Sequence, residues 1–138
     1  MARILTLALL VLGLFACGGP DEYVLTGTSR SAGTDGMMIV EDTGGNQMIT
    51  VELEHLPPPN RVSAQGRHYV VWIKPGNGAP AMAGQLDYDE DERVGRMTAT
   101  SPHSNFELII TVENSMNASH PSEIVVAKKR TSTGNGSN

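Results

Sequence analysis

Short runs of β-branched and aromatic residues recur along the chain, and turn-forming residues separate them. The run 67–74 (RHYVVWIK) contains the only tryptophan and lies between Gly66 and Pro75. Alternation places two sets of side chains on opposite faces of this strand: Tyr69, Val71 and Ile73 on one, and His68, Val70 and Trp72 on the other. Both faces carry apolar side chains, which is typical of a strand in the middle of a sheet that is covered on both sides.

The same criteria predict strands elsewhere in the chain. These strands are 23–28, 37–40, 47–54, 82–88, 94–100, 105–113 and 124–127. Residues 42–46 (DTGGN) have the turn chemistry that joins hairpin strands, and the prolines at 57–59 favour an extended polyproline segment. No amphipathic helix is evident after residue 17. Seven to eight short strands predict an all-β fold, a sandwich of two antiparallel sheets, and a small barrel is the alternative closure.

The composition limits the partners of this chain. Its 138 residues suffice for one domain, and one cysteine excludes an internal disulfide. With Arg3 set aside as part of a leader, nine cationic side chains face fifteen carboxylates, a net charge of −6. This balance argues against nucleic acid as a partner and against wide contact with anionic lipid headgroups.

Residues 1–16 predict a cleaved secretory signal peptide, because Arg3 precedes an apolar run that is too short for a comfortable transmembrane span. The only cysteine follows at once, in the sequence Leu14-Phe15-Ala16-Cys17-Gly18. This stretch resembles the lipobox of bacterial lipoproteins, although Phe15 is bulkier than the family prefers at that position. The resemblance implies cleavage between Ala16 and Cys17 and attachment of fatty-acyl chains such as palmitate to Cys17. The alternative is an ordinary secreted protein with a chance cysteine.

Two or three acyl chains would anchor the protein stably, because each buried methylene contributes about 0.8 kcal/mol. The expected partner is therefore a lipid bilayer, and the expected location is the bacterial cell envelope. Gly18 stands where enteric lipoproteins carry an inner-membrane retention Asp, which favours the outer membrane if that rule applies. The predicted division is a signal peptide at 1–16, an acylated cysteine and tether at 17–22, a β-sandwich at 23–130 and a disordered polar tail at 131–138.

The order of motifs over residues 23–128 resembles the C-terminal, extracytoplasmic domain of anti-sigma-K factors, an immunoglobulin-like β-sandwich. The matching pieces are Leu56-Pro57-Pro58, Tyr69-Val70-Val71-Trp72-Ile73, Ala83-Gly84-Gln85-Leu86, Thr111-Val112-Glu113 and Ile124-Val125-Val126. The family's sigma-binding domain and transmembrane helix are absent from this sequence, and the predicted signal peptide and lipid anchor stand in their place. The resemblance therefore implies a fold and carries over no anti-sigma activity.

Several patterns could carry chemistry, and each has a structural alternative. Asp42-Thr43-Gly44 matches the aspartic-protease tripeptide but is explained by a hairpin turn. Residues 87–92 (DYDEDE) could offer oxygens to Ca²⁺, yet they fail the EF-hand pattern and read as the end of a strand followed by a solvated turn. The four histidines show no ligand spacing for zinc. The methionines could hold Cu(I), and the alternative is that they fill a core short of aromatic residues.

Residues 128–130 (KKR) form a small basic cluster that could contact headgroups or polymer, the alternative being a solvated chain end. Together these patterns predict a non-catalytic binding or structural module that needs no cofactor and no metal. Its loops or an exposed sheet edge would contact another envelope protein. A periplasmic module that binds a small ligand or a metal is the alternative.

Overall fold

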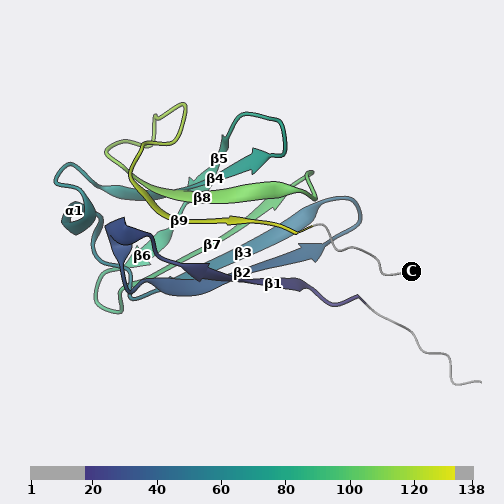
Figure 1. The fold of residues 1–138 in the computed structure, drawn as a ribbon, viewed down its shortest axis with the longest axis horizontal. Coiled ribbons are helices and arrows are strands. Elements are labelled where there is room, and N and C mark those ends of the chain that lie inside the picture. The colour runs from purple at the N-terminus through teal and green to yellow at the C-terminus, as the bar shows by residue number, and fades with distance from the viewer. Residues whose placement is uncertain (1–17, 133–138) are drawn as a thin grey trace, which may run out of the picture.

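The computed structural model describes residues 18–132. Nine strands form two antiparallel sheets that pack face to face, with the connections between strands at both ends (Figure 1). The five-stranded sheet has the order β1-β2-β3-β7-β6, and the four-stranded sheet has the order β5-β4-β8-β9. The predicted all-β sandwich is confirmed.

The strands follow the predicted segments closely. Their bounds are β1 Asp21–Thr26, β2 Asp35–Asp42, β3 Gln47–Glu54, β4 His68–Pro75, β5 Ala81–Gln85, β6 Asp87–Asp89, β7 Val94–Ser101, β8 Phe106–Glu113 and β9 Val125–Arg130. The chain also forms a 3₁₀ turn at Ser29–Ser31 and a single α-helical turn, α1, at Pro59–Val62. The polyproline segment predicted to include Pro59 is thus wrong at that residue, because the fixed φ of proline also suits the first position of a helix.

The predicted strand 82–88 is divided between the two sheets, which gives nine strands instead of seven or eight. β5 pairs with β4 in one sheet, and β6 pairs with β7 in the other. Leu86 lies between them, is buried, and donates its backbone N–H to the carbonyl oxygen of Tyr69 over 2.9 Å. Alternation gives the face to which a side chain points but not the strand with which its backbone pairs, so sequence alone did not reveal this change of sheet.

The core lies between the sheets and is built from alternating residues of both. Tyr69, Val71 and Ile73 of β4 belong to it, as predicted. On the opposite face of the same strand Val70 is 0% exposed and Trp72 is 1% exposed, so β4 is covered on both sides. This confirms β4 as an interior strand, with β5 on one side and β8 on the other.

Methionine contributes less to the core than expected. Met38 is fully buried, and Met97 packs against the core while remaining partly exposed. The other described methionines are partly exposed: Met37, Met48, Met82 and Met116. Aliphatic side chains supply most of the buried volume instead.

Two tyrosines from different sheets bind consecutive carbonyl oxygens after β3. The hydroxyl of Tyr69 donates to the carbonyl of Pro57, and that of Tyr88 donates to the carbonyl of Leu56 over 2.6 Å. The two rings meet edge to face with centroids 5.5 Å apart. Burial raises the pKa of both hydroxyl groups, so they remain protonated donors over the ordinary pH range.

Hydrogen bonds join the segment that follows β1 to β9 at the lateral edge of the sandwich. The N–H of Thr28 donates to the carbonyl of Val126 over 2.8 Å, and the Thr28 hydroxyl donates to that of Val125 over 2.6 Å. Thr131 is 7% exposed and donates its N–H to the carbonyl of Phe106. The folded domain therefore includes Thr131, one residue past the predicted boundary, and residues 133–138 of the predicted tail lie outside the described part.

Candidate functional site

The predicted lipid-attachment residue and cleavage site lie just outside the described residues. Cys17 and Ala16 precede Gly18, the first residue that the structure describes. Acylation of Cys17 and removal of residues 1–16 therefore stay predictions. The structure shows instead where an anchor at that position would join the folded domain.

The tether is shorter than the sequence predicted. β1 begins at Asp21, so Asp21 and Glu22 belong to the sheet, and only Gly18, Gly19 and Pro20 separate it from Cys17. The four Cα–Cα steps from Cys17 to Asp21 span at most about 14 Å. An anchor on Cys17 would hold this end of β1 close to the bilayer.

Both ends of the described chain lie at the same end of the sandwich (Figure 1). We call this the tether end. It also contains the β2–β3 turn and the β7–β8 loop, whose residues line one hollow of about 330 Å³ together with residues 18–21 and 131–132. The carboxylate residues among those that line it are Asp21, Glu41 and Asp42.

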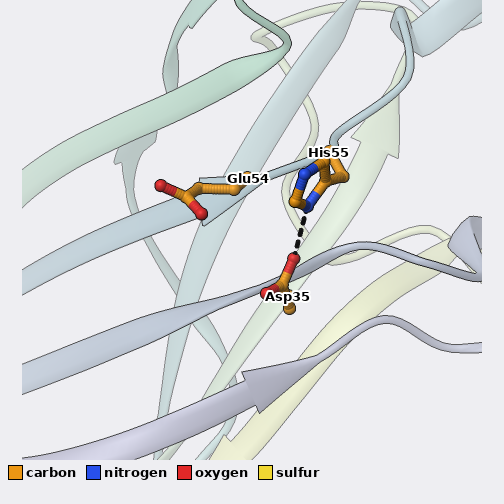
Figure 2. A group of neighbouring side chains, drawn as sticks. All are labelled: Asp35, Glu54 and His55. Atoms are coloured by element: carbon orange, nitrogen blue, oxygen red, sulfur yellow. Dashed lines mark hydrogen bonds and ion pairs between the residues drawn. The ribbon is translucent and has the colours of Figure 1, made fainter.

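A cluster of three ionisable side chains occupies the opposite end, which we call the far end. Asp35 is the first residue of β2, Glu54 is the last residue of β3, and His55 follows Glu54 (Figure 2). One potential ligand atom from each lies within 4.8 Å of the others. His55 Nδ1 lies 2.7 Å from Asp35 Oδ1, and both side chains are largely solvent-exposed.

The β2–β3 turn sets the register that assembles this cluster. Asp42 Oδ1 accepts hydrogen bonds from the N–H groups of Gly44 and Gly45, which both have positive φ. These bonds lower the pKa of the Asp42 carboxyl. The predicted hairpin turn is thereby confirmed as the role of this tripeptide. Asp42 pairs with Gln47, and the same register pairs Asp35 with Glu54.

The backbone holds His55 beside Asp35. His55 has a φ of 54°, in the left-handed region that non-glycine residues seldom adopt. The Thr34 hydroxyl donates to the carbonyl of His55 over 3.0 Å, and the next N–H, that of Leu56, donates to the carbonyl of Arg93 over 2.9 Å. The backbone is thus fixed on both sides of the peptide group that follows His55.

One imidazole nitrogen and two carboxylates are a ligand set that Zn²⁺ or Mn²⁺ accepts. The sequence interpretation missed this set, because it sought histidines near one another instead of a carboxylate 20 residues away across a hairpin. The sequence does contain a signal for this set. Once the turn pairs residue 42 with residue 47, residue 35 must pair with residue 54. Among the described residues, this is the group of His, Asp and Glu whose potential ligand atoms lie close enough together to share a metal ion.

The acidic segment 87–92 has a structural role in the fold. Asp87–Asp89 forms β6, and Asp89 Oδ1 accepts the N–H of Glu92 over 2.9 Å at the turn into β7. The solvated turn predicted at 89–92 is confirmed at 90–92, whereas Asp89 is the last residue of β6. This segment is not part of the cluster at the far end.

Within residues 18–132, no helix has the length and apolar character required to cross a bilayer. Comparison of the chain with protein-family models, with curated proteins and with solved structures finds no match.

Proposed function

We propose that this protein is a cell-envelope lipoprotein whose immunoglobulin-like β-sandwich is held at a bilayer by acyl chains on Cys17. The single observation that carries the proposal is the spacing between that cysteine and the folded domain. Only Gly18, Gly19 and Pro20 lie between Cys17 and β1, which suits a short membrane anchor. The signal-like leader and the lipobox resemblance at residues 14–17 supply the chemistry of that anchor.

This placement gives the two ends of the sandwich different roles. β2 runs the length of the domain from Asp35 to Asp42, a distance of about 23 Å at 3.3 Å per residue. The far end therefore lies about this distance from the anchored end, and it presents α1, the β8–β9 loop and the Asp35 cluster at the start of β2. We propose that the module is non-catalytic and that these far-end loops contact another envelope protein.

Expression of the full chain in a bacterial host tests the anchor. Intact-mass measurement is expected to show a chain that begins at Cys17 and carries two or three acyl groups. Cys17→Ser should release the protein into soluble fractions or leave the leader uncleaved. A mature chain that begins elsewhere, or an unmodified Cys17, would contradict the proposal.

The Asp35 cluster favours a second candidate function, which is binding of a divalent cation at the far end. The supporting observation is the approach of three potential ligand atoms to within 4.8 Å of one another on a hairpin of fixed register. Calorimetric titration of the folded domain with Zn²⁺ tests this function. His55→Ala should abolish the binding heat, whereas His103→Ala, an exposed histidine outside the cluster, should retain it. Equal heats from the two variants would refute the site.

A further inference from the structure

The two sheets of the sandwich carry opposite charge. The strands of the five-stranded sheet contain nine carboxylates and one cation, Arg96. The strands of the four-stranded sheet contain two carboxylates, Glu107 and Glu113, and four cations. The net negative charge of the chain therefore conceals a sheet with an excess of positive charge.

Three of those cations lie on the outer side of the four-stranded sheet. Ile73, Leu108 and Ala127 point into the core, so their neighbours along the strands point away from it. The outward cations are Lys74 of β4 and Lys128 and Arg130 of β9, which we call the basic face. Cross-strand pairing places Lys74 and Arg130 on either side of Glu107, and it places Lys128 and Trp72 on either side of Ile109.

The basic face lies beside the tether end. The β4 segment that carries Lys74 ends at Pro75, which pairs with Phe106, and Phe106 accepts a hydrogen bond from Thr131 near the end of the described chain. Lys74 and Arg130 line one hollow of about 220 Å³, which Glu107 also lines. Arg130 Nη2 lies 3.7 Å from Glu107 Oε2, and the arginine side chain is 75% exposed. Glu107 thus lies between two of the three cations of the basic face, Lys74 and Arg130.

We infer that the basic face lies against anionic phospholipid headgroups and sets the orientation of the anchored domain. The inference rests on the proposed attachment through Cys17, because attachment keeps the face near the bilayer surface, where the lipid potential is strong. That potential decays over about 8 Å at physiological salt. The basic face is drawn to the surface and the acidic five-stranded sheet is repelled from it, so the domain tilts onto its four-stranded sheet. Each of the three cations raises the population of this orientation about fivefold.

The chain contains its own probes for a test of this orientation. Cys17 is the only thiol and Trp72 the only tryptophan, and the side chain of Trp72 projects from the same side of β4 as Lys74. Residues 17–138 include every strand of the sandwich, so this chain can be coupled through Cys17 to a maleimide phospholipid in vesicles. Quenching of Trp72 fluorescence by a headgroup spin label then reports how close the basic face lies to the bilayer.

Quenching is expected to be stronger in vesicles with about 30% phosphatidylglycerol than in phosphatidylcholine alone. The increase should disappear in about 1 M NaCl, where the screening length is about 3 Å. Lys74→Gln with Lys128→Gln should reduce it strongly, because only Arg130 of the basic face remains. The matched control is Arg61→Gln with Arg96→Gln, which removes the same charge from α1 and the acidic sheet and should retain it.

Equal quenching in the two kinds of vesicle, or an equal response of the two double variants, would overturn the inference. Because the lipid is attached chemically, this result is independent of acylation in a cell. A chain that is not acylated in its host but tilts on phosphatidylglycerol refutes the proposed anchor and supports the basic face. An acylated chain without tilt supports the anchor and refutes the face.

Discussion

The indole Nε1 of Trp72 donates a hydrogen bond to the hydroxyl oxygen of Thr111 over 2.9 Å, joining β4 to β8 outside the main core. The Thr111 hydroxyl in turn donates to Glu113 Oε1 over 2.6 Å, and the same carboxylate oxygen accepts the N–H of Ser122 over 2.8 Å. Trp72, Thr111 and Glu113 are all buried. This chain of hydrogen bonds ties the β8–β9 loop to the sheet that carries the basic face.

We expect Trp72→Ala to lower the free energy of unfolding by about 3–5 kcal/mol, because it removes a large buried aromatic side chain. Trp72→Phe should cost less, about 1–3 kcal/mol, because it keeps a ring and loses mainly the bond to Thr111. Urea unfolding followed by circular dichroism measures both changes. An unchanged unfolding midpoint in Trp72→Ala would contradict the burial of this side chain.

Glu113→Ala should detach the β8–β9 loop from the sheet. It leaves the N–H of Ser122 and the hydroxyl of Thr111 without their acceptor, a loss of about 1–3 kcal/mol. Hydrogen exchange at the Ser122 amide should become faster in this variant. Glu123→Ala is the control, because Glu123 is exposed and surface substitutions change stability by about 0.5 kcal/mol or less. Similar exchange rates in the two variants would argue against the role of Glu113.

We expect the free energy of unfolding to fall at alkaline pH because of Tyr69 and Tyr88. Burial raises the pKa of Tyr69 and Tyr88 above the ordinary value of 10.0, so the unfolded chain releases these protons at lower pH than the folded chain. The contribution of these two protonated hydroxyl groups to the free energy of unfolding is therefore complete below about pH 10, and it declines as the pH rises further. Urea unfolding between pH 8 and 11 should show this decline, and Tyr69→Phe should reduce its slope. An identical slope in wild type and variant would refute this assignment.

Gly36 allows β2 and β3 to approach each other closely. A Cβ at this position would lie 2.0 Å from the carbonyl oxygen of Glu52, so the backbone must move to admit it. Gly36→Ala should cost about 1–3 kcal/mol, as other overpacking substitutions do. It should also weaken any cation binding at Asp35, because that residue is next to the displaced backbone. Gly76→Ala, whose Cβ meets no atom within 4 Å, should leave the unfolding midpoint nearly unchanged, and equal midpoints for both variants would contradict this packing.

Local patterns determined most of the strands. The alternation over 47–54 and the turn residues 42–46 are both reproduced in the structure, because hairpin formation depends on residues that are close in sequence. The same register pairs Asp35 with Glu54, so this pairing could also be predicted from the sequence. The prediction of a signal peptide and an acylated Cys17 likewise depends on residues that are adjacent in the sequence.

Tertiary structure alone decided which strands become neighbours. The division of residues 81–89 between two sheets depends on partners far away in the sequence, and a period of two residues holds no information about them. The charge difference between the sheets arises in the same way. Lys74 and Arg130 are 56 residues apart and face one hollow only because β4 and β9 both flank β8. The sequence by itself determined the strand pattern and the overall charge, whereas long-range pairing of strands determined where that charge lies.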